Sequence, residues 1–243
     1  MARQMTTCAT NPNSVGTFLR AEVQKVRDWI AGRTASLTWY CVAAIVAGAG
    51  SYGAAIGAWR EPLQALYTGI KLPLAILLTT LGNGLLNGML APLLGLNVTV
   101  RQSLALVLFS FAVTAIILGA LSPVALFLVW NTPPLNAATQ LSASEYGLLQ
   151  LTLALFVAVA GFTGCARLRP LLREWAGSAH IGGRVLFAWL ATNLLLGSQI
   201  CWVLRPFIWD PAGPVRFIGR EYLRGSFFET LFEAARRLIF SSL

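Results

Sequence analysis

The chain has 243 residues, of which 56% are hydrophobic and only 11% are charged, and its mean hydropathy is +0.68. A soluble domain normally carries about a quarter charged residues. The composition therefore excludes an ordinary soluble protein and predicts an integral membrane protein.

The first 34 residues form a polar region that precedes the hydrophobic part of the chain. Residues 1–14 are polar and lack the apolar core of a signal peptide. In the stretch "VGTFLRAEVQKVRDWIAGR" (15–33), apolar residues recur at helical spacing on one face, and charged residues occupy another. This helix is too short and too charged to span a bilayer, so we predict that it lies at the membrane interface.

Five apolar blocks follow, each with about the 20 residues that a membrane-spanning helix needs. The blocks are Ser36–Trp59, Ile70–Leu94, Gln102–Trp130, Tyr146–Leu168 and Val185–Leu204. Because proline removes a backbone hydrogen bond, we expect the third block to kink or end at Pro123. The uncharged loop "NTPPLNAATQLSASE" separates the third block from the fourth.

The last part of the chain, residues 206–243, is rich in arginine and aromatic residues. Its end, "FFETLFEAARRLIF", places apolar residues on one helical face and predicts a second interfacial helix. The predicted fold is therefore all-α. A bundle of about five transmembrane helices, in residues 35–205, is flanked by an amphipathic helix in 1–34 and another in 206–243.

The net charge of +9 comes from sixteen arginines and two lysines against nine acids. In a membrane protein such an excess indicates orientation and contact with anionic lipid headgroups rather than nucleic-acid binding. With the N-terminus in the cytoplasm, ten basic residues fall on the inner side, and only Arg60 and Lys71 fall in outer loops. Six arginines from Arg205 to Arg237 would then lie outside, and an even number of spans would be needed to bring them inside.

Residues that could support catalysis, metal binding or proton transport are scarce inside the spans. All nine acids fall in flanks or loops, so the mid-membrane carboxylate typical of proton-coupled transporters is missing. His180 is the only histidine, which argues against a histidine triad or metal cluster, and "GAGSYG" around Ser51 lacks a partner base. No phosphate-binding loop is present. We therefore expect no metal site, no cofactor and no enzymatic activity.

The cysteines show no paired spacing. They are Cys8, Cys41, Cys165 and Cys201. Single cysteines within spans usually act as small apolar residues, so we predict a structural role for them.

Small residues in the spans predict surfaces where helices approach closely. Pairs of glycines four residues apart occur at Gly53 and Gly57 and at Gly84 and Gly88, and a further glycine, Gly197, lies in the fifth block. We predict that all five are helix-packing residues.

Polar residues in the second and fifth blocks form the candidate functional site. Asn83 and Asn87 share one face of the second block, where they either hydrogen-bond another helix or line a path for a polar ligand. In the fifth block, Asn193 shares a face with Gly197, whereas Gln199 points elsewhere.

Arg205 follows directly after the fifth block, in "GSQICWVLRPFIWDP". One interpretation is that its side chain extends to the headgroups as an anchor, beside the interfacial Trp202 and Trp209. The other is that it turns inward to the polar residues, or pairs with Asp210, and pins the tail over the bundle.

Three segments carry a resemblance to a known family: "IKLP" at the start of the second block, "LSP" near the end of the third, and "GSQICWVLRPF". They resemble a poorly characterised bacterial membrane family that is similar in layout to the Yip superfamily, and the resemblance covers most of residues 15–235. It implies a cytoplasmic N-terminus and about five helices. Some members bear the name "actin-binding WH2 domain-containing". That name implies an amphipathic helix followed by a short basic motif, and the stretch "VRDWIAGRT" offers a helix and a single Arg-Thr. The acidic-Gly-Pro signature of eukaryotic Yip proteins is missing.

These observations favour a non-enzymatic multi-pass membrane protein that acts as a membrane-organising or adaptor subunit. Its expected partners are the bilayer with its anionic headgroups, other membrane proteins or further copies of itself. The alternative is a transporter or channel for a small solute, lined by Asn83, Asn87, Asn193 and Gln199. An enzyme acting on lipid is the third hypothesis. The preference for arginine over lysine is typical of a GC-rich bacterial genome and hence favours a bacterial inner membrane.

Overall fold

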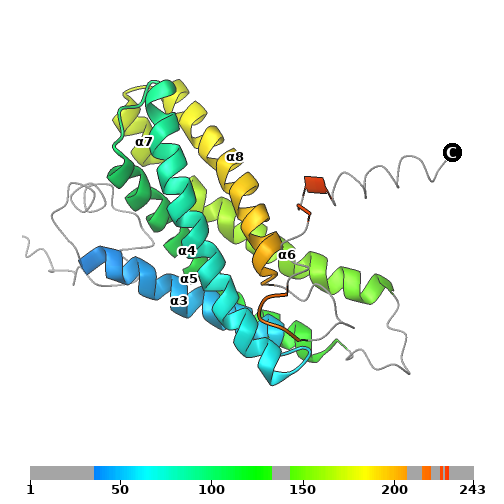
Figure 1. Cartoon of the computed structure of the whole chain (residues 1–243). Helices are drawn as coiled ribbons and strands as arrows, with labels where there is room; N and C mark the ends of the chain where they lie inside the picture. The colour runs from blue at the N-terminus through cyan, green and yellow to red at the C-terminus, as the bar shows by residue number, and fades with distance from the viewer. Residues whose placement is uncertain (1–35, 133–142, 207–214, 220–224, 227, 230–243) are drawn as a thin grey trace, which may run out of the picture.

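The computed structural model describes residues 36–132, 143–206, 215–219, 225–226 and 228–229. This part of the chain is helical and contains no β-strand (Figure 1). Its helices are α3 (Ser36–Gly57), α4 (Pro62–Leu93), α5 (Val100–Trp130), α6 (Ala143–Ala166), α7 (Arg169–Ala176) and α8 (Ala179–Leu204). Five segments are long and apolar enough to cross a membrane, and the fourth of them, Leu148–Ala176, includes the short α7 together with most of α6.

The prediction of an all-α membrane protein with five spans is confirmed. The amphipathic helix predicted for residues 15–33 lies outside the described residues. Of the helix predicted in the tail, Phe228 and Glu229 are described and are helical, and the rest lies outside the described part of the chain.

Helix α4 begins at Pro62, eight residues before the predicted start of the second block. Proline suits a first helical position because its missing N–H would have no partner there. Polar residues in the first turns remain compatible with a helix because their side chains bond within it. The Gln64 amide donates to the Thr68 hydroxyl at 3.2 Å, and that hydroxyl donates to the Gln64 carbonyl at 2.8 Å. Lys71, which we had expected in an outer loop, therefore lies inside α4.

Pro123 does not end α5, which continues to Trp130. A proline leaves the carbonyl four residues earlier, here that of Gly119, without its helical N–H donor. The Ser122 hydroxyl donates to this carbonyl at 2.7 Å and so replaces the missing bond. Because free backbone groups are costly in hydrocarbon, this substitute donor explains how the helix continues through the proline.

The centre of the bundle is formed by α3, α4 and α5, each of which packs against the other two. Glycines set the distance between the helices. A Cβ at Gly48 would lie 2.1 Å from the Ala115 carbonyl oxygen of α5, and a Cβ at Gly53 would lie 2.5 Å from the Thr68 carbonyl oxygen of α4. The helices can therefore approach this closely only because no side chain stands between their backbones.

The remaining helices pack around this centre. Helix α6 packs on α5, α8 packs along α4, and α7 packs against α8. In Figure 1 the two long helices α4 and α8 lie side by side, and α7 lies near the start of α8. Helix α6 thus packs beside α5, and α8 packs beside α4.

The first prediction concerns the contact between α3 and α5. Replacing Gly48 with alanine places a methyl group against backbone atoms of Ala115, which can move only if the helices separate. We expect Gly48→Ala to lower the free energy of unfolding by about 1–3 kcal/mol, measured by reversible unfolding in detergent micelles. Gly161→Ala is the matched control, because a Cβ at Gly161 meets nothing within 4 Å. Equal stabilities of the two variants would contradict the close α3–α5 approach.

Candidate functional site

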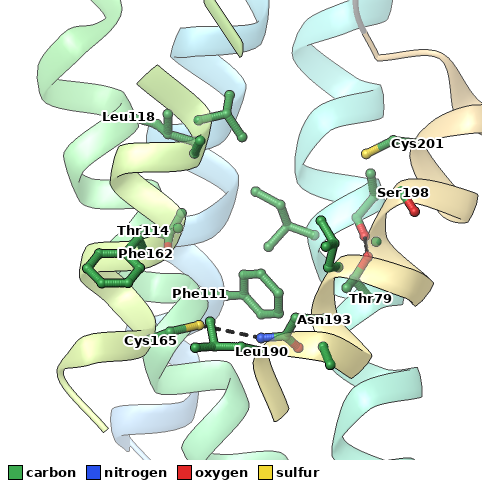
Figure 2. A pocket seen from close by; sticks show the side chains of 18 of the residues that line it. Thr79, Phe111, Thr114, Leu118, Phe162, Cys165, Leu190, Asn193, Ser198 and Cys201 are labelled. Atoms are coloured by element: carbon green, nitrogen blue, oxygen red, sulfur yellow. Dashed lines mark hydrogen bonds between the residues drawn. The ribbon is translucent and has the colours of Figure 1, made fainter. Parts of the chain in front are cut away.

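A cavity of about 650 Å³ lies within the membrane-spanning part of the bundle, lined by residues of α4, α5, α6 and α8. Figure 2 shows α6 and α8 on opposite sides of it, with α5 residues such as Phe111 and Leu118 between them. Most of its wall is apolar. The lining residues with a polar or sulfur-containing side chain are Thr79, Thr114, Cys165, Asn193, Ser198 and Cys201.

The hydroxyl groups of the wall bond within their own helices. Thr79 donates to the Ala75 carbonyl at 2.7 Å, Thr114 to the Ser110 carbonyl at 3.0 Å, and Ser198 to the Leu195 carbonyl at 3.1 Å. Each hydroxyl hydrogen therefore points at the backbone rather than into the cavity. The cavity surface is consequently more apolar than its residue types suggest.

A chain of polar contacts joins four helices near one end of the cavity, and Figure 2 shows its bond between Asn193 and Cys165. Asn83 of α4 donates from Nδ2 to Oδ1 of Asn193 in α8. Asn193 in turn donates from Nδ2 to the Cys165 Sγ of α6 at 3.5 Å, and the Ser110 hydroxyl of α5 donates to the same sulfur at 3.6 Å. These hydrogen bonds therefore connect the polar side chains of four helices that are otherwise apolar.

The five residues of the predicted polar site do not gather at one point. Asn83 and Asn193 contact each other, whereas Gln199 is half-buried and does not line the cavity. Arg205 lies twelve positions after Asn193, or about 18 Å along the helix axis. Arg205 lies at the end of α8, with its guanidinium 4.9 Å from the centre of the Trp202 ring.

Asn87 lies in the interface between α4 and α5. Its side chain is fully buried, and neither its Oδ1 nor its Nδ2 has a hydrogen-bond partner in the described part of the chain. On α4, Asn87 lies between two glycines that contact α5, because Gly84 contacts Leu104 and Gly88 contacts Val100. Ser103, whose buried hydroxyl is also without a partner there, lies between the same two contacts on α5.

Four of the five glycines predicted to pack helices lie at very close contacts. A Cβ at Gly53 or Gly57 would stand 2.5 Å from a carbonyl oxygen of α4. A Cβ at Gly84 would stand 2.9 Å from the Leu104 Cα, and one at Gly88 would stand 2.8 Å from the Val100 Cα. At Gly197 the nearest atom would be the Thr79 Cγ2 at 3.5 Å, which is ordinary van der Waals contact.

Several residues of the site were not singled out from the sequence. Gly164 of α6 allows α6 to approach α5, since a Cβ there would lie 2.5 Å from the Ser110 carbonyl oxygen. Cys165 accepts two hydrogen bonds, a role that its spacing from other cysteines could not reveal. The described cysteines, Cys41, Cys165 and Cys201, are free thiols. Among the described residues, no three histidine, cysteine or acidic residues group as metal ligands would.

Lys71 is the other residue whose role the sequence did not show. It is 2% exposed, and its Nζ donates to the Arg216 carbonyl of the tail at 3.2 Å. The same Nζ lies 5.3 Å from the centre of the Phe217 ring, and that ring packs edge-on against Tyr67. Residues 215–219 of the tail therefore return to α4.

Comparison with known protein families, with curated proteins and with solved structures finds no match to this chain. The function must therefore be argued from the cavity and the residues around it.

The second prediction concerns the bond between Asn83 and Asn193. Interhelical hydrogen bonds in membrane proteins are worth about 0.6 kcal/mol on average and up to about 1.7. We expect a double-mutant cycle of Asn83→Leu and Asn193→Leu to give a coupling energy in this range, measured by unfolding in detergent. The matched cycle of Asn87→Leu with Asn193→Leu should give coupling near zero, because Asn87 makes no hydrogen bond to Asn193. Similar coupling in both cycles would contradict a specific bond.

Proposed function

We propose that the protein is a non-enzymatic membrane protein that holds an acyl chain of a membrane lipid in the cavity and acts as a membrane-organising or adaptor subunit. The observation that carries this proposal is the largely apolar cavity of about 650 Å³ inside the spans. Its volume is within the roughly 300–1,000 Å³ typical of small-molecule sites. A polar solute would lose its hydration there with few groups to replace it, whereas a hydrocarbon chain loses nothing.

The position of the cavity supports lipid as its occupant. Three of its lining residues, Phe162 of α6 and Phe187 and Leu194 of α8, are also among the most exposed apolar residues, at 67%, 74% and 71%. In a membrane such side chains face the lipid tails. The cavity therefore opens sideways to the bilayer, and an acyl chain can enter without passing through water.

The alternative of a polar-solute transporter receives less support from the geometry. Of its four proposed lining residues, only Asn193 lines the cavity, and its amide is bonded to Asn83 and Cys165. Asn83 and Asn87 are fully buried between helices. In these positions the asparagines are better placed to stabilise the packing of the helices than to line a path for a polar solute.

The wider role is part of the same proposal. The sequence lacks a catalytic constellation, and the resemblance to the Yip-like bacterial family in layout supports an organising role rather than a reaction. Under this proposal, the extensive apolar surface of α6 and α8 is available to lipids and to other membrane proteins. The preference for arginine over lysine supports placement in a bacterial inner membrane.

The third prediction tests whether the cavity holds lipid. Gly161 lines the cavity and has open space at its Cβ position, so Gly161→Phe should fill the cavity without displacing the backbone. We expect this variant to retain markedly less lipid through purification in a mild detergent, measured by native mass spectrometry. The matched control is Gly183→Phe, which also has open space but lies away from the cavity. Equal lipid retention by both variants would refute the proposal.

The fourth prediction concerns orientation, which we propose has the N-terminus in the cytoplasm. Since Lys71 lies inside α4, only Arg60 remains as a basic residue in the loop between α3 and α4. The segment between α6 and α8 carries several arginines and should lie inside. A cysteine at Ser178, in a chain without other cysteines, should react with a membrane-impermeant thiol reagent only after the cells are opened. A cysteine at Thr139, outside the described residues, should react in intact spheroplasts, and the reverse pattern would invert the topology.

A further inference from the structure

Lys71, a buried cation of α4, directly precedes a residue that lines the cavity. Lys71 follows the start of α4 by nine residues, and the next residue, Leu72, lines the cavity together with Ala75 one turn later. On α8, Cys201 lines the cavity and Arg205 follows it by one turn. Helices α4 and α8 run antiparallel, with Asn83 beside Asn193 and Thr79 beside Gly197, and the same register continued to the end of α8 places Arg205 opposite Lys71.

The described residues give Lys71 little to balance its charge. An ammonium group has three N–H donors, and here one is met by the Arg216 carbonyl while the Phe217 ring faces the group. No carboxylate pairs with Lys71 among the residues that the structure describes. A buried ammonium group without a carboxylate beside it is unfavourable unless another negative charge accompanies it.

The level of this cation pair in the membrane indicates which anion is available. Arg205 directly follows the last residue of α8, and the Trp202 ring lies beside its guanidinium, as is usual at the headgroup level of a bilayer. The register of α4 against α8 places Lys71 near the same level. An amphiphile with a chain in the cavity would therefore bring its polar end to these two residues.

We propose that Lys71, together with Arg205, binds the phosphate of an anionic phospholipid whose acyl chain occupies the cavity between α6 and α8. This inference rests on the proposed function and adds the class of lipid and the residues that select it. Lys71 supplies a compact point charge, and Arg205 supplies a planar group suited to bidentate contact with phosphate oxygens. The lipid would join α4 to the end of α8 by contacts at both its head and its chain.

The test compares two lipids that share their acyl chains and differ in headgroup charge. The full-length protein, purified in detergent, is titrated with dioleoyl phosphatidylglycerol or dioleoyl phosphatidylcholine, and the bound lipid is measured by native mass spectrometry. One basic residue near a membrane surface changes anionic lipid binding about fivefold. We therefore expect the wild-type protein to bind phosphatidylglycerol at least about fivefold more tightly than phosphatidylcholine.

Variants assign this preference to Lys71. Lys71→Met should weaken phosphatidylglycerol binding about fivefold and phosphatidylcholine binding much less, because the choline cation offsets the charge of its phosphate. The phosphatidylcholine binding that remains also shows that the variant is folded. Lys71→Arg should keep the preference. Arg184→Met, at the exposed start of α8, removes the same charge far from the site and should keep it as well. Loss of the preference in Arg184→Met would mean that net charge, not this site, selects the lipid.

The outcomes separate this inference from the proposed function. Equal binding of the two lipids by the wild-type protein overturns the headgroup site, whatever the variants do. If the wild-type protein binds both lipids equally and Gly161→Phe weakens the binding of both, the proposed function stands, because the cavity still holds an acyl chain. If Gly161→Phe changes neither lipid while Lys71→Met removes the preference, the headgroup contact stands without a chain in the cavity, and the two-part site is wrong. If inorganic phosphate alone raises the melting temperature of the wild-type protein but not of Lys71→Met, the site takes a free anion and the lipid assignment fails.

Discussion

The close approach of the α3 backbone to α4 and α5 is the constraint on which the rest of the structure depends. Hydrocarbon surrounds a membrane bundle, so burying apolar side chains gives no driving force for association, and helices associate through tight packing and interhelical hydrogen bonds. Gly48 and Gly53 remove the side chains that would keep α3 away from its two neighbours. With these three helices fixed, α6 and α8 are supported on α5 and α4, and the space between them becomes the cavity.

Hydrogen bonding then determines where polar groups can lie inside this bundle. The threonine hydroxyls that line the cavity donate to carbonyls of their own helices, and the Ser122 hydroxyl does the same for the carbonyl freed by Pro123. The chain from Asn83 through Asn193 to Cys165 is a different arrangement, since it crosses between helices. It ties α8 and α6 together at one end of the cavity while leaving the apolar wall intact.

The sequence predicted the fold well because the signals for membrane spans are local: length, hydropathy and the absence of charge. It predicted the glycine pairs at Gly53 and Gly84 for the same reason, since a four-residue spacing defines one face of a helix. It could not identify Gly48, whose importance comes from Ala115 on another helix, or show that Asn193 rather than Asn87 pairs with Asn83. Lys71, the second residue of the predicted block Ile70–Leu94, was counted with the outer loop because a charge at the end of a span is expected to face water. Here a tail segment 145 residues later supplies its acceptor inside α4.

The backbone of Arg205 determines the path of the chain as it leaves the membrane. With φ at 44°, it adopts a left-handed conformation that costs a residue with a side chain roughly 1–2 kcal/mol, and Pro206 then admits only a narrow range of φ. Together the two residues make a corner at the end of α8. A chain cut after this corner would keep its five spans and its cavity, but the lid formed by Arg216 and Phe217 over Lys71 would be gone. The Lys71 ammonium group would then lack the carbonyl and the ring that contact it in the full chain.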